Sequence, residues 1–230
     1  MTKTFKIFRY DPEKDKKPYF KSFAIEVKEG MTILDVLNKI KAEQDSTLTY
    51  RRSCRSGVCG SCAININGKN TLACYTQIST IRQKKITLRP LPGFEIIKDL
   101  VVNWEPFFDN IAKILPYLNS GNFPEKEFIQ TPEERRNLTE PINCILCACC
   151  SSSCPMSWTN NEFLGPAAFL KAYRFIADSR DNKHKERLEK LNDELTGVWR
   201  CHTVYNCFNS CPKKIDLTYF ITKLKHGVKP

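Results

Sequence analysis

The sequence predicts an α+β protein in two parts, a strand-rich part over residues 1–102 and an all-helical part over residues 103–230. Apolar residues alternate with polar ones early in the chain, which indicates strands, whereas after residue 103 they recur at helical spacing. Prolines and a glycine between residues 90 and 93 interrupt the pattern and mark the boundary. At 230 residues the chain is long enough for two modest domains, each with its own core.

Two strands open the first part. Alternation predicts them over Thr4–Tyr10 and Phe20–Val27, with a polar loop that contains two prolines between them. In the second strand every other residue is apolar and is expected to face a core. These inward-facing residues are Phe23, Ile25 and Val27.

A helix and a hairpin should follow. Thr32 and Asp35 have the spacing of a capping box, and the apolar residues behind them fall at helical spacing. Asn67-Gly68 is a typical hairpin turn after the apolar segment 64–66, and segment 86–88 supplies a last strand. The helical apolar residues are Ile33, Val36, Leu37 and Ile40.

Four cysteines in this part have the Cys-x4-Cys-x2-Cys…Cys spacing of plant-type 2Fe–2S ferredoxins. Three thiolates that converge on one small cluster require a tightly wrapped backbone, which Gly57 and Gly60 permit. Backbone N–H groups turned toward the sulfur atoms would stabilise the reduced cluster. We therefore expect a β-grasp ferredoxin domain. Its predicted 2Fe–2S ligands are Cys54, Cys59, Cys62 and Cys74.

Other interpretations of this loop are a zinc site or buried structural cysteines. Zinc frameworks usually pair two Cys-x2-Cys knuckles, and only Cys59 and Cys62 form one here. Three matching spacings also argue against cysteines that serve packing alone. The neighbouring basic residues have two possible roles, as part of a solvated loop edge or as contacts to a partner protein. They are Arg51, Arg52 and Arg55.

The second part contains the Cys-x2-Cys-x2-Cys-x3-Cys-Pro run of bacterial two-cluster ferredoxins, from Cys144 to Pro155. In such a run the first three cysteines hold one cluster and the fourth ligates another. A second copy runs from Cys201 to Pro212, with Val204 at its second ligand position. The cluster that lacks this thiolate is expected to lose one iron. The predicted ligands are Cys144, Cys147, Cys150 and Cys211 for a 4Fe–4S cluster, and Cys154, Cys201 and Cys207 for a 3Fe–4S cluster.

Helices should surround these runs, which predicts an α-helical ferredoxin domain. An apolar stripe over 107–118 indicates a packing helix, and segment 119–140 is expected to be a loop. Pro166 begins a helix that continues to Ala177, and Asp216 caps another. A further helix carries Leu188, Leu191 and Leu195. Cys149 lies outside the ligand frame and is predicted to be a small buried hydrophobe.

Composition limits the compartment and the partners. The clustered cysteines and the lack of a signal peptide predict metal ligation in a reducing compartment. The sequence contains no run of eighteen apolar residues, so we expect no membrane-spanning segment. The net charge is +11, and residues 1–100 carry 19 basic and 10 acidic side chains. Without a basic helix interleaved with aromatics, we expect no nucleic-acid partner.

The order of these motifs resembles the iron–sulfur subunits of succinate dehydrogenase, respiratory complex II, nearly from end to end. The most specific stretches are segments 51–62, 144–155, 165–181 and 200–207. Fumarate reductases share the cysteines, but Arg200-Cys201-His202 and Trp158 are more similar to the succinate-oxidising branch. A free multi-cluster ferredoxin and a cysteine-rich nucleic-acid module are the alternatives from other classes.

The resemblance implies a complete electron path. A partner flavoprotein would oxidise succinate at a covalent FAD, and electrons would pass singly through the 2Fe–2S, 4Fe–4S and 3Fe–4S clusters to ubiquinone. Membrane anchor subunits would hold this chain peripherally on the inner face of an energy-coupling membrane, either the mitochondrial inner membrane on its matrix side or a bacterial plasma membrane on its cytoplasmic side. The family's quinone-site positions map onto Pro155, Trp158 and His202. Where the family often has two adjacent tryptophans, this chain has Trp158-Thr159.

Overall fold

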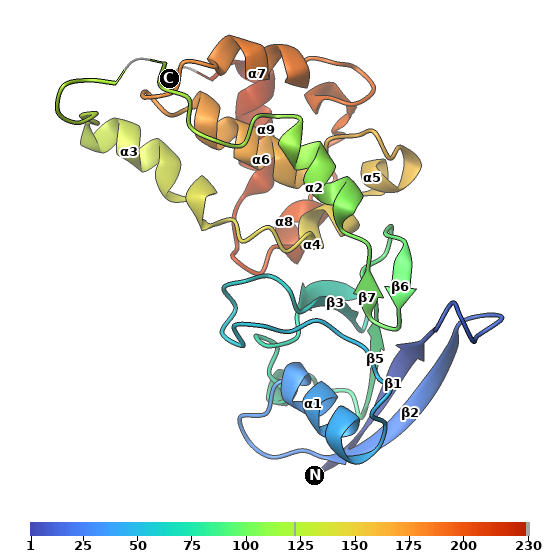
Figure 1. The fold of residues 1–230 in the computed structure, drawn as a ribbon. Coiled ribbons are helices and arrows are strands. Elements are labelled where there is room, and N and C mark those ends of the chain that lie inside the picture. Colours follow the sequence, from blue (N-terminus) through green and yellow to red (C-terminus); the bar gives the residue numbers. More distant parts are fainter. Residues whose placement is uncertain (122, 229–230) are drawn as a thin grey trace. The chain divides into compact units, whose positions relative to one another are not determined.

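A computed structural model describes every residue of the chain except 122, 229 and 230. By packing, the chain divides into two units (Figure 1). The N-terminal unit contains residues 1–104 and 145–152, and the C-terminal unit contains residues 105–144 and 153–230. The sequence suggests domains over residues 1–102 and 103–230, and these boundaries stay a prediction. Segment 145–152, which carries part of the first ferredoxin run, packs with the N-terminal unit.

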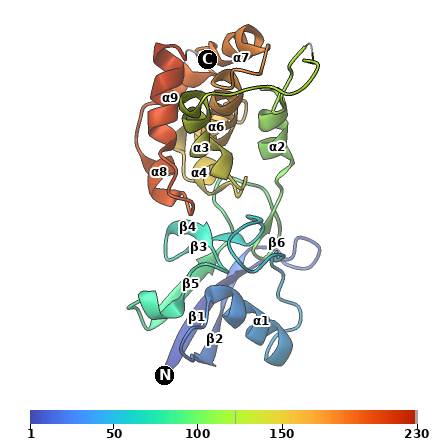
Figure 2. The same cartoon turned by 90° about the vertical axis from the view of Figure 1, so that its left-hand side faces the viewer.

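The N-terminal unit is built on a mixed five-stranded sheet in the order β2-β1-β5-β3-β4. Strand β1 pairs antiparallel with β2 and parallel with β5, and β3 pairs antiparallel with both β5 and β4. With helix α1 packed on the sheet (Figure 2), this is the predicted β-grasp arrangement. The bounds are β1 Thr2–Arg9, β2 Tyr19–Glu26, α1 Ile33–Glu43, β3 Ala63–Ile66, β4 Lys69–Leu72, η1 Ile78–Thr80 and β5 Lys85–Arg89.

Helix α1 begins where the sequence predicts it. The Thr32 hydroxyl accepts a hydrogen bond from the Asp35 backbone N–H, and the Asp35 carboxylate accepts one from Thr32 N. This capping box satisfies N–H groups that the first helical turn leaves unpaired. The apolar face of α1 is buried, and each fully buried apolar side chain contributes about 1.5–3 kcal/mol to the free energy of folding. The fully buried residues include Ile33, Val36 and Ile40 of α1 with Phe5, Ile7 and Ile25 of the sheet.

A small two-stranded sheet was not predicted from the sequence. It pairs β6 Ile96–Lys98 with β7 Val101–Val102. Between these strands lies Asp99, whose carboxylate accepts hydrogen bonds from Arg9 Nε (2.9 Å) and Thr49 N (2.8 Å). The Arg9 guanidinium also donates to Asp45 (2.6 Å). This buried network ties the end of β1 to the loop after α1.

The C-terminal unit is helical, as predicted. Helix α6 forms its centre, and nearly all of its residues are buried. Helix α9 packs against it, with the Tyr173 and Phe220 rings 4.7 Å apart. The helical segments are α2 Glu105–Ala112, α3 Pro132–Thr139, η2 Pro141–Asn143, α5 Pro155–Thr159, α6 Gly165–Ile176, α7 His184–Leu191, η3 Val198–Arg200, α8 Asn206–Ser210 and α9 Leu217–His226; the short α4, Cys149–Ser152, belongs to the N-terminal unit.

Three helices of this unit differ from their predicted extents. Helix α2 ends at Ala112, well before residue 118, and Leu115 has a left-handed backbone (φ +53°) that stops it. Helix α3 lies in the segment predicted to be a loop, where Thr131 and Glu134 form a capping box ahead of a polar sequence. Helix α7 ends at Leu191, and Leu195 is exposed.

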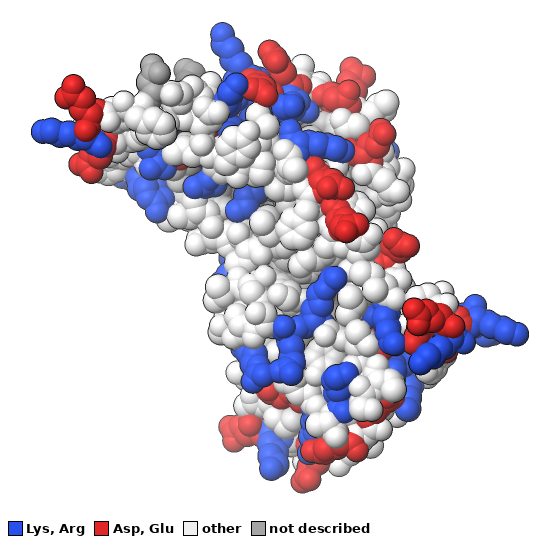
Figure 3. All heavy atoms as spheres, in the orientation of Figure 1, with Lys and Arg blue, Asp and Glu red and all other residues white. Residues whose placement is uncertain are grey.

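Two surface properties bear on the partners of the chain. Among the residues that the structure describes, no helix is both long enough and apolar enough to cross a bilayer. Figure 3 shows Lys and Arg side chains spread over the visible face of the N-terminal unit, with Asp and Glu among them. Residues 1–100 carry most of the basic excess, since residues 101–230 have 17 basic and 15 acidic groups.

Candidate metal centres

The loop after Tyr50 turns backbone N–H groups toward the Cys54 sulfur. The amides of Ser56, Val58 and Cys59 lie 3.4, 3.3 and 3.3 Å from Cys54 Sγ. These hydrogen bonds, led by the one from Ser56, lower the pKa of the Cys54 thiol to about 6. Cys54 is therefore prepared as a thiolate, which is the form that ligates iron.

The other three cysteines of this loop are connected in the same way. Gly57 N lies 3.3 Å from Cys74 Sγ, and Cys74 N lies 3.4 Å from Cys62 Sγ. The Ser61 hydroxyl donates to Cys59 Sγ at 3.2 Å. Gly57 and Gly60 have left-handed backbones, with φ of +70° and +75°. The wrapped loop predicted from the glycines is thus present, and each of the four sulfur atoms accepts a hydrogen bond from it or from its neighbours.

Burial differs across these four cysteines. Cys62 and Cys74 are buried, whereas Cys54 is exposed. Burial raises the pKa of the Cys62 thiol to about 12, so this residue needs bound iron to become a thiolate. The donors around the sulfur atoms fit a negatively charged cluster, because N–H···S bonds stabilise added electrons.

In the described part of the chain, no three Cys, His, Asp or Glu side chains converge on a point that could hold one metal ion. A cluster spreads its thiolates over several irons, so it does not require that convergence.

The two cysteine runs of the C-terminal part, which begin at Cys144 and Cys201, have the same sequence of backbone conformations. A 3-10 turn (η2 or η3) ends just before the first cysteine, Cys144 or Cys201. Left-handed residues follow two and four positions later, and a helix (α4 or α8) begins at the fifth position. Non-glycine residues adopt this backbone at a cost, usually where a site requires it. The left-handed residues are Leu146 (φ +53°) and Ala148 (+62°) in the first run, and Thr203 (+56°) and Tyr205 (+60°) in the second.

This correspondence matches Val204 with Cys147. Both lie between the two left-handed residues of their run. Cys147 and Cys150 are buried, and Cys149 is fully buried, as predicted for a small hydrophobe. Cys144 and Cys211 are half-buried, and Ile215 N lies 3.4 Å from Cys211 Sγ.

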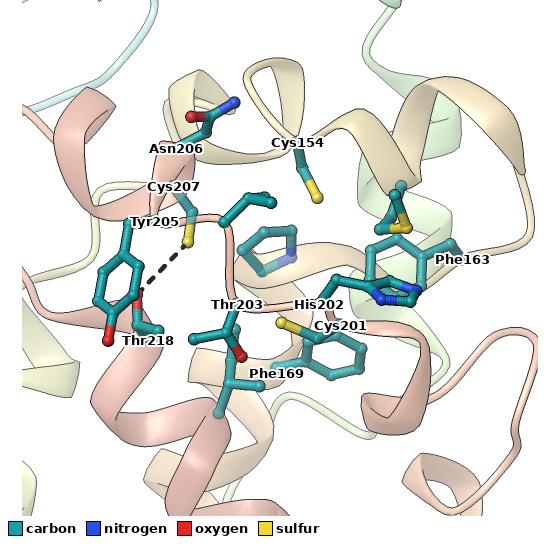
Figure 4. Close-up of a pocket in the computed structure, with 14 residues that line it drawn as sticks. Cys154, Phe163, Phe169, Cys201, His202, Thr203, Tyr205, Asn206, Cys207 and Thr218 are labelled. Atoms are coloured by element: carbon teal, nitrogen blue, oxygen red, sulfur yellow. Dashed lines mark hydrogen bonds between the residues drawn. The ribbon is translucent and has the colours of Figure 1, made fainter.

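A pocket in the C-terminal unit is lined by Cys154, Cys201 and Cys207. Figure 4 shows their sulfur atoms directed into the same cavity. Val204 also lines it, and the remaining wall is largely apolar. These apolar residues are Met156, Phe163, Pro166, Phe169 and Ile221.

The surroundings of the pocket shift the pKa of one of its cysteines. Burial raises the pKa of Cys207 to about 11. The buried Thr218 hydroxyl lies 4.0 Å from Cys207 Sγ and lowers this pKa in part. Three cysteine sulfur atoms and one valine in a largely apolar cavity fit a three-thiolate cluster. Thr218 could not be predicted from the sequence, because nothing in its local pattern places it beside the pocket.

The residues predicted for a quinone lie on two segments that flank this pocket. His202 is exposed and lines it. Pro155 occupies the first turn of α5 directly after Cys154, and Trp158 is 51% exposed on the same short helix. Trp158 therefore does not pack in the helical core. Pro155 and Trp158 do not line the pocket itself.

The basic residues of the 2Fe–2S loop have different surroundings. Arg51 donates to the Val102 carbonyl (2.7 Å), and its guanidinium lies 5.2 Å from the Trp104 ring centre. Arg52 and Arg55 are exposed, as are Val58 and Tyr75. Arg51 thus has a structural role within its unit.

Comparison with known proteins agrees with both domains. Residues 4–109 match the family of 2Fe-2S iron-sulfur cluster binding domains, and residues 140–215 match the 4Fe-4S dicluster domains. A chain of the Sdh1 complex of Mycobacterium smegmatis in the apo form has the same fold, with a TM-score of 0.88 at 24% identity over 98% of this chain and 94% of that one. The protein is therefore a two-domain iron–sulfur protein.

Its relatives define it more narrowly. The chain is 48% identical over 226 residues to the succinate dehydrogenase iron-sulfur subunit of Coxiella burnetii, covering 96% of this chain and 95% of that protein. It is also 48% identical to the mitochondrial iron-sulfur subunit 1 of succinate dehydrogenase [ubiquinone] from Oryza sativa, over 97% of this chain and 81% of that one. The chain belongs to the family of succinate dehydrogenase iron–sulfur subunits.

Proposed function

We propose that this chain carries electrons singly from the FAD of a partner flavoprotein to ubiquinone. The ligands would be Cys54, Cys59, Cys62 and Cys74 for a 2Fe–2S cluster, Cys144, Cys147, Cys150 and Cys211 for a 4Fe–4S cluster, and Cys154, Cys201 and Cys207 for a 3Fe–4S cluster. When bound, these clusters would supply successive one-electron carriers between the flavin and the quinone.

One observation carries the assignment of the last two ligand sets. The runs from Cys144 and from Cys201 have left-handed residues and helix starts at the same offsets. The crossing rule of two-cluster ferredoxins depends on that correspondence, because it assigns each fourth cysteine to the other cluster. The same correspondence supports the proposal that Val204 occupies the position of the fourth thiolate of the last cluster.

The protein's own groups would set the order of the potentials. Backbone amides directed at Cys54 and Cys74 stabilise negative charge in the first loop. The wall around Cys154, Cys201 and Cys207 is largely apolar and would limit the access of water to that site. Burial and cluster type both set the potential of an iron–sulfur centre, and a 3Fe–4S cluster in this pocket would suit the last carrier before quinone.

Quinone binding is proposed beside the pocket of the last cluster. His202 is exposed there, and its imidazole could hold or protonate a quinone oxygen. The exposed Trp158 ring could contact the quinone, and Pro155 would shape the chain next to Cys154. Membrane anchor subunits would complete the site and hold the chain peripherally on the inner face of the energy-coupling membrane.

The test separates the two ends of the path in the assembled complex. Cys207→Ala should abolish ubiquinone reduction by succinate while leaving succinate oxidation by an artificial flavin-level acceptor intact. Cys149→Ala, which removes a buried cysteine outside the ligand sets, is the matched control and should keep both activities. Undiminished quinone reduction in Cys207→Ala would contradict the proposed path.

A further inference from the structure

Gly60 brings the backbones of two cysteine-bearing loops into contact. It lies between Cys59 and Cys62, and a Cβ atom at this position would be 2.8 Å from the Ile145 carbonyl oxygen and 3.0 Å from Cys147 Cα. Real Cβ atoms do not approach backbone atoms so closely. Only glycine therefore lets the first loop touch segment 145–152.

A second contact fixes the other end of that segment. The Ser152 hydroxyl donates to the Pro92 carbonyl (2.6 Å) and accepts a hydrogen bond from Asn70 Nδ2 (3.1 Å). Asn70 Oδ1 in turn accepts from Asn65 Nδ2 (2.7 Å). All three side chains are buried, with Ser152 only 1% exposed. A buried chain of this kind is costly to break, because it leaves polar groups without partners.

We propose that Gly60 and Ser152 are positioning residues that dock segment 145–152, with Cys147 and Cys150, against the loop with Cys59 and Cys62. The two contacts together set the separation between the first and second clusters. This inference rests on the proposed function, since it needs those cysteines to ligate the 2Fe–2S and 4Fe–4S clusters. Neither residue binds iron; each acts through the backbone that carries the ligands.

The separation of the 2Fe–2S and 4Fe–4S clusters can be followed through properties that depend on distance. Electron tunnelling and the magnetic interaction between two paramagnetic clusters both weaken as the clusters separate. Displacing segment 145–152 should therefore weaken the interaction without changing the type of either cluster. This separates positioning from ligation, which would change cluster content.

Gly60→Ala and Gly30→Ala form a matched pair for the test. Both glycines have left-handed backbones in the N-terminal unit, so alanine strains each similarly. At Gly30, however, the added Cβ would meet no described atom within 4 Å, and Gly30 lies outside the cysteine loop. The backbone strain is thus common to both variants, and only Gly60→Ala pushes against segment 145–152.

The measurement is electron paramagnetic resonance of the dithionite-reduced complex. The 2Fe–2S signal should relax fast beside the reduced 4Fe–4S cluster in the unsubstituted protein and in Gly30→Ala. In Gly60→Ala the 2Fe–2S signal should remain but lose part of that relaxation enhancement. Equal enhancement in the two variants would overturn the inference.

Ser152→Ala and Ser151→Ala repeat the comparison without altering the glycine loop. The neighbouring Ser151 is also buried, but its hydroxyl has no hydrogen-bond partner in the described structure. Ser152→Ala should reduce the relaxation enhancement and speed amide exchange in segment 145–152 by on the order of tenfold. Ser151→Ala should change neither.

Equal relaxation enhancement and equal amide exchange in Ser152→Ala and Ser151→Ala would contradict the proposal. This comparison also decides the matter if Gly60→Ala fails to assemble. Absence of the 2Fe–2S signal from the unsubstituted protein would instead contradict the proposed function.

Discussion

The Thr218 hydroxyl lies 4.0 Å from the sulfur of Cys207, and both side chains are buried (Figure 4). Thr218 lies in the first turn of α9, which Asp216 caps by accepting a hydrogen bond from Tyr219 N. If Cys207 is a ligated thiolate, only the hydroxyl can donate in this pair. This contact would give the proposed last cluster a hydrogen bond that tunes its potential.

Thr218→Val should lower the potential of the last cluster. Valine keeps the shape and removes the donor, so the reduced state loses about 1 kcal/mol, or about 40 mV for a one-electron couple. A redox titration followed by paramagnetic resonance measures this. Thr222→Val, which removes a hydroxyl bonded to the Thr218 carbonyl on the same helix, is the control and should leave the potential unchanged. A potential unaltered in both variants would show that the Thr218 hydroxyl does not reach the cluster.

His202→Ala should slow ubiquinone reduction while succinate oxidation by a flavin-level acceptor continues. The reason is that an exposed histidine beside the pocket would hold or protonate the quinone, not the flavin. Parallel assays of the assembled complex check it. His226→Ala alters another exposed histidine, in the last turn of α9, and should affect neither rate. Equal losses in both assays would point to a structural role for His202.

Cys149→Ala should keep all three clusters, because the ligand sets are complete without it. Its thiol is fully buried and lowers the pKa of Cys147 through a side-chain hydrogen bond. Iron coordination fixes the Cys147 thiolate more strongly than that bond does, so ligation should persist. Iron and acid-labile sulfide analysis measures the outcome, with Cys150→Ala as the variant expected to lose a cluster. Loss of a whole cluster from Cys149→Ala would refute the ligand assignment.

Asp45→Asn should destabilise the N-terminal unit equally at pH 8 and pH 5.5. Burial raises the pKa of Asp45, but hydrogen bonds from Lys21, Thr47 and Arg9 outweigh it and hold the pKa below its ordinary value of 3.8. The carboxylate therefore contributes its full stability above pH 3.8 and loses it only as the pH falls further. Losing these charged hydrogen bonds should cost about 1.5–3 kcal/mol.

Thermal unfolding of the Asp45→Asn protein at the two pH values measures this effect. Glu43→Gln, which removes an exposed ion pair with Lys39, should have little effect at either pH. A smaller effect of Asp45→Asn at pH 5.5 than at pH 8 would mean that its pKa is raised.

Features encoded in a few adjacent residues could be predicted from the sequence. The capping box at Thr32 and Asp35, the turn at Asn67-Gly68 and the helix that begins near Pro166 each depend on short-range chemistry, and each is present. The cysteine spacings belong to the same class, because the loop geometry of a cluster dictates them. They identified both cluster-binding domains.

Features that depend on contacts between distant segments could not be predicted. The approach of Gly60 to Ile145 and the chain from Asn70 to Ser152 arise only after the sheet has formed. Arg187 is a further example. It is fully buried on a helix that looked amphipathic, where it pairs with Asp181 and donates to main-chain carbonyls of segment 114–117.

The missed helix α3 is different, because the sequence did contain its signal. Thr131 and Glu134 have capping-box spacing, with proline at the first helical position, yet the surrounding charge suggested a loop. A polar helix with a single buried residue, Leu138, has no apolar periodicity to reveal it.

We propose that the last centre is a 3Fe–4S cluster because Val204 occupies its fourth ligand position. Low-temperature electron paramagnetic resonance of the oxidised protein, with and without Val204→Cys, tests it most directly. The unsubstituted protein should show the oxidised-state signal of a 3Fe–4S cluster. Val204→Cys should lose that signal, because the restored thiolate retains a fourth iron, and the resulting cubane, a different type of cluster, should have a lower potential. An oxidised protein without the signal, or a variant that keeps it unchanged, would contradict the account.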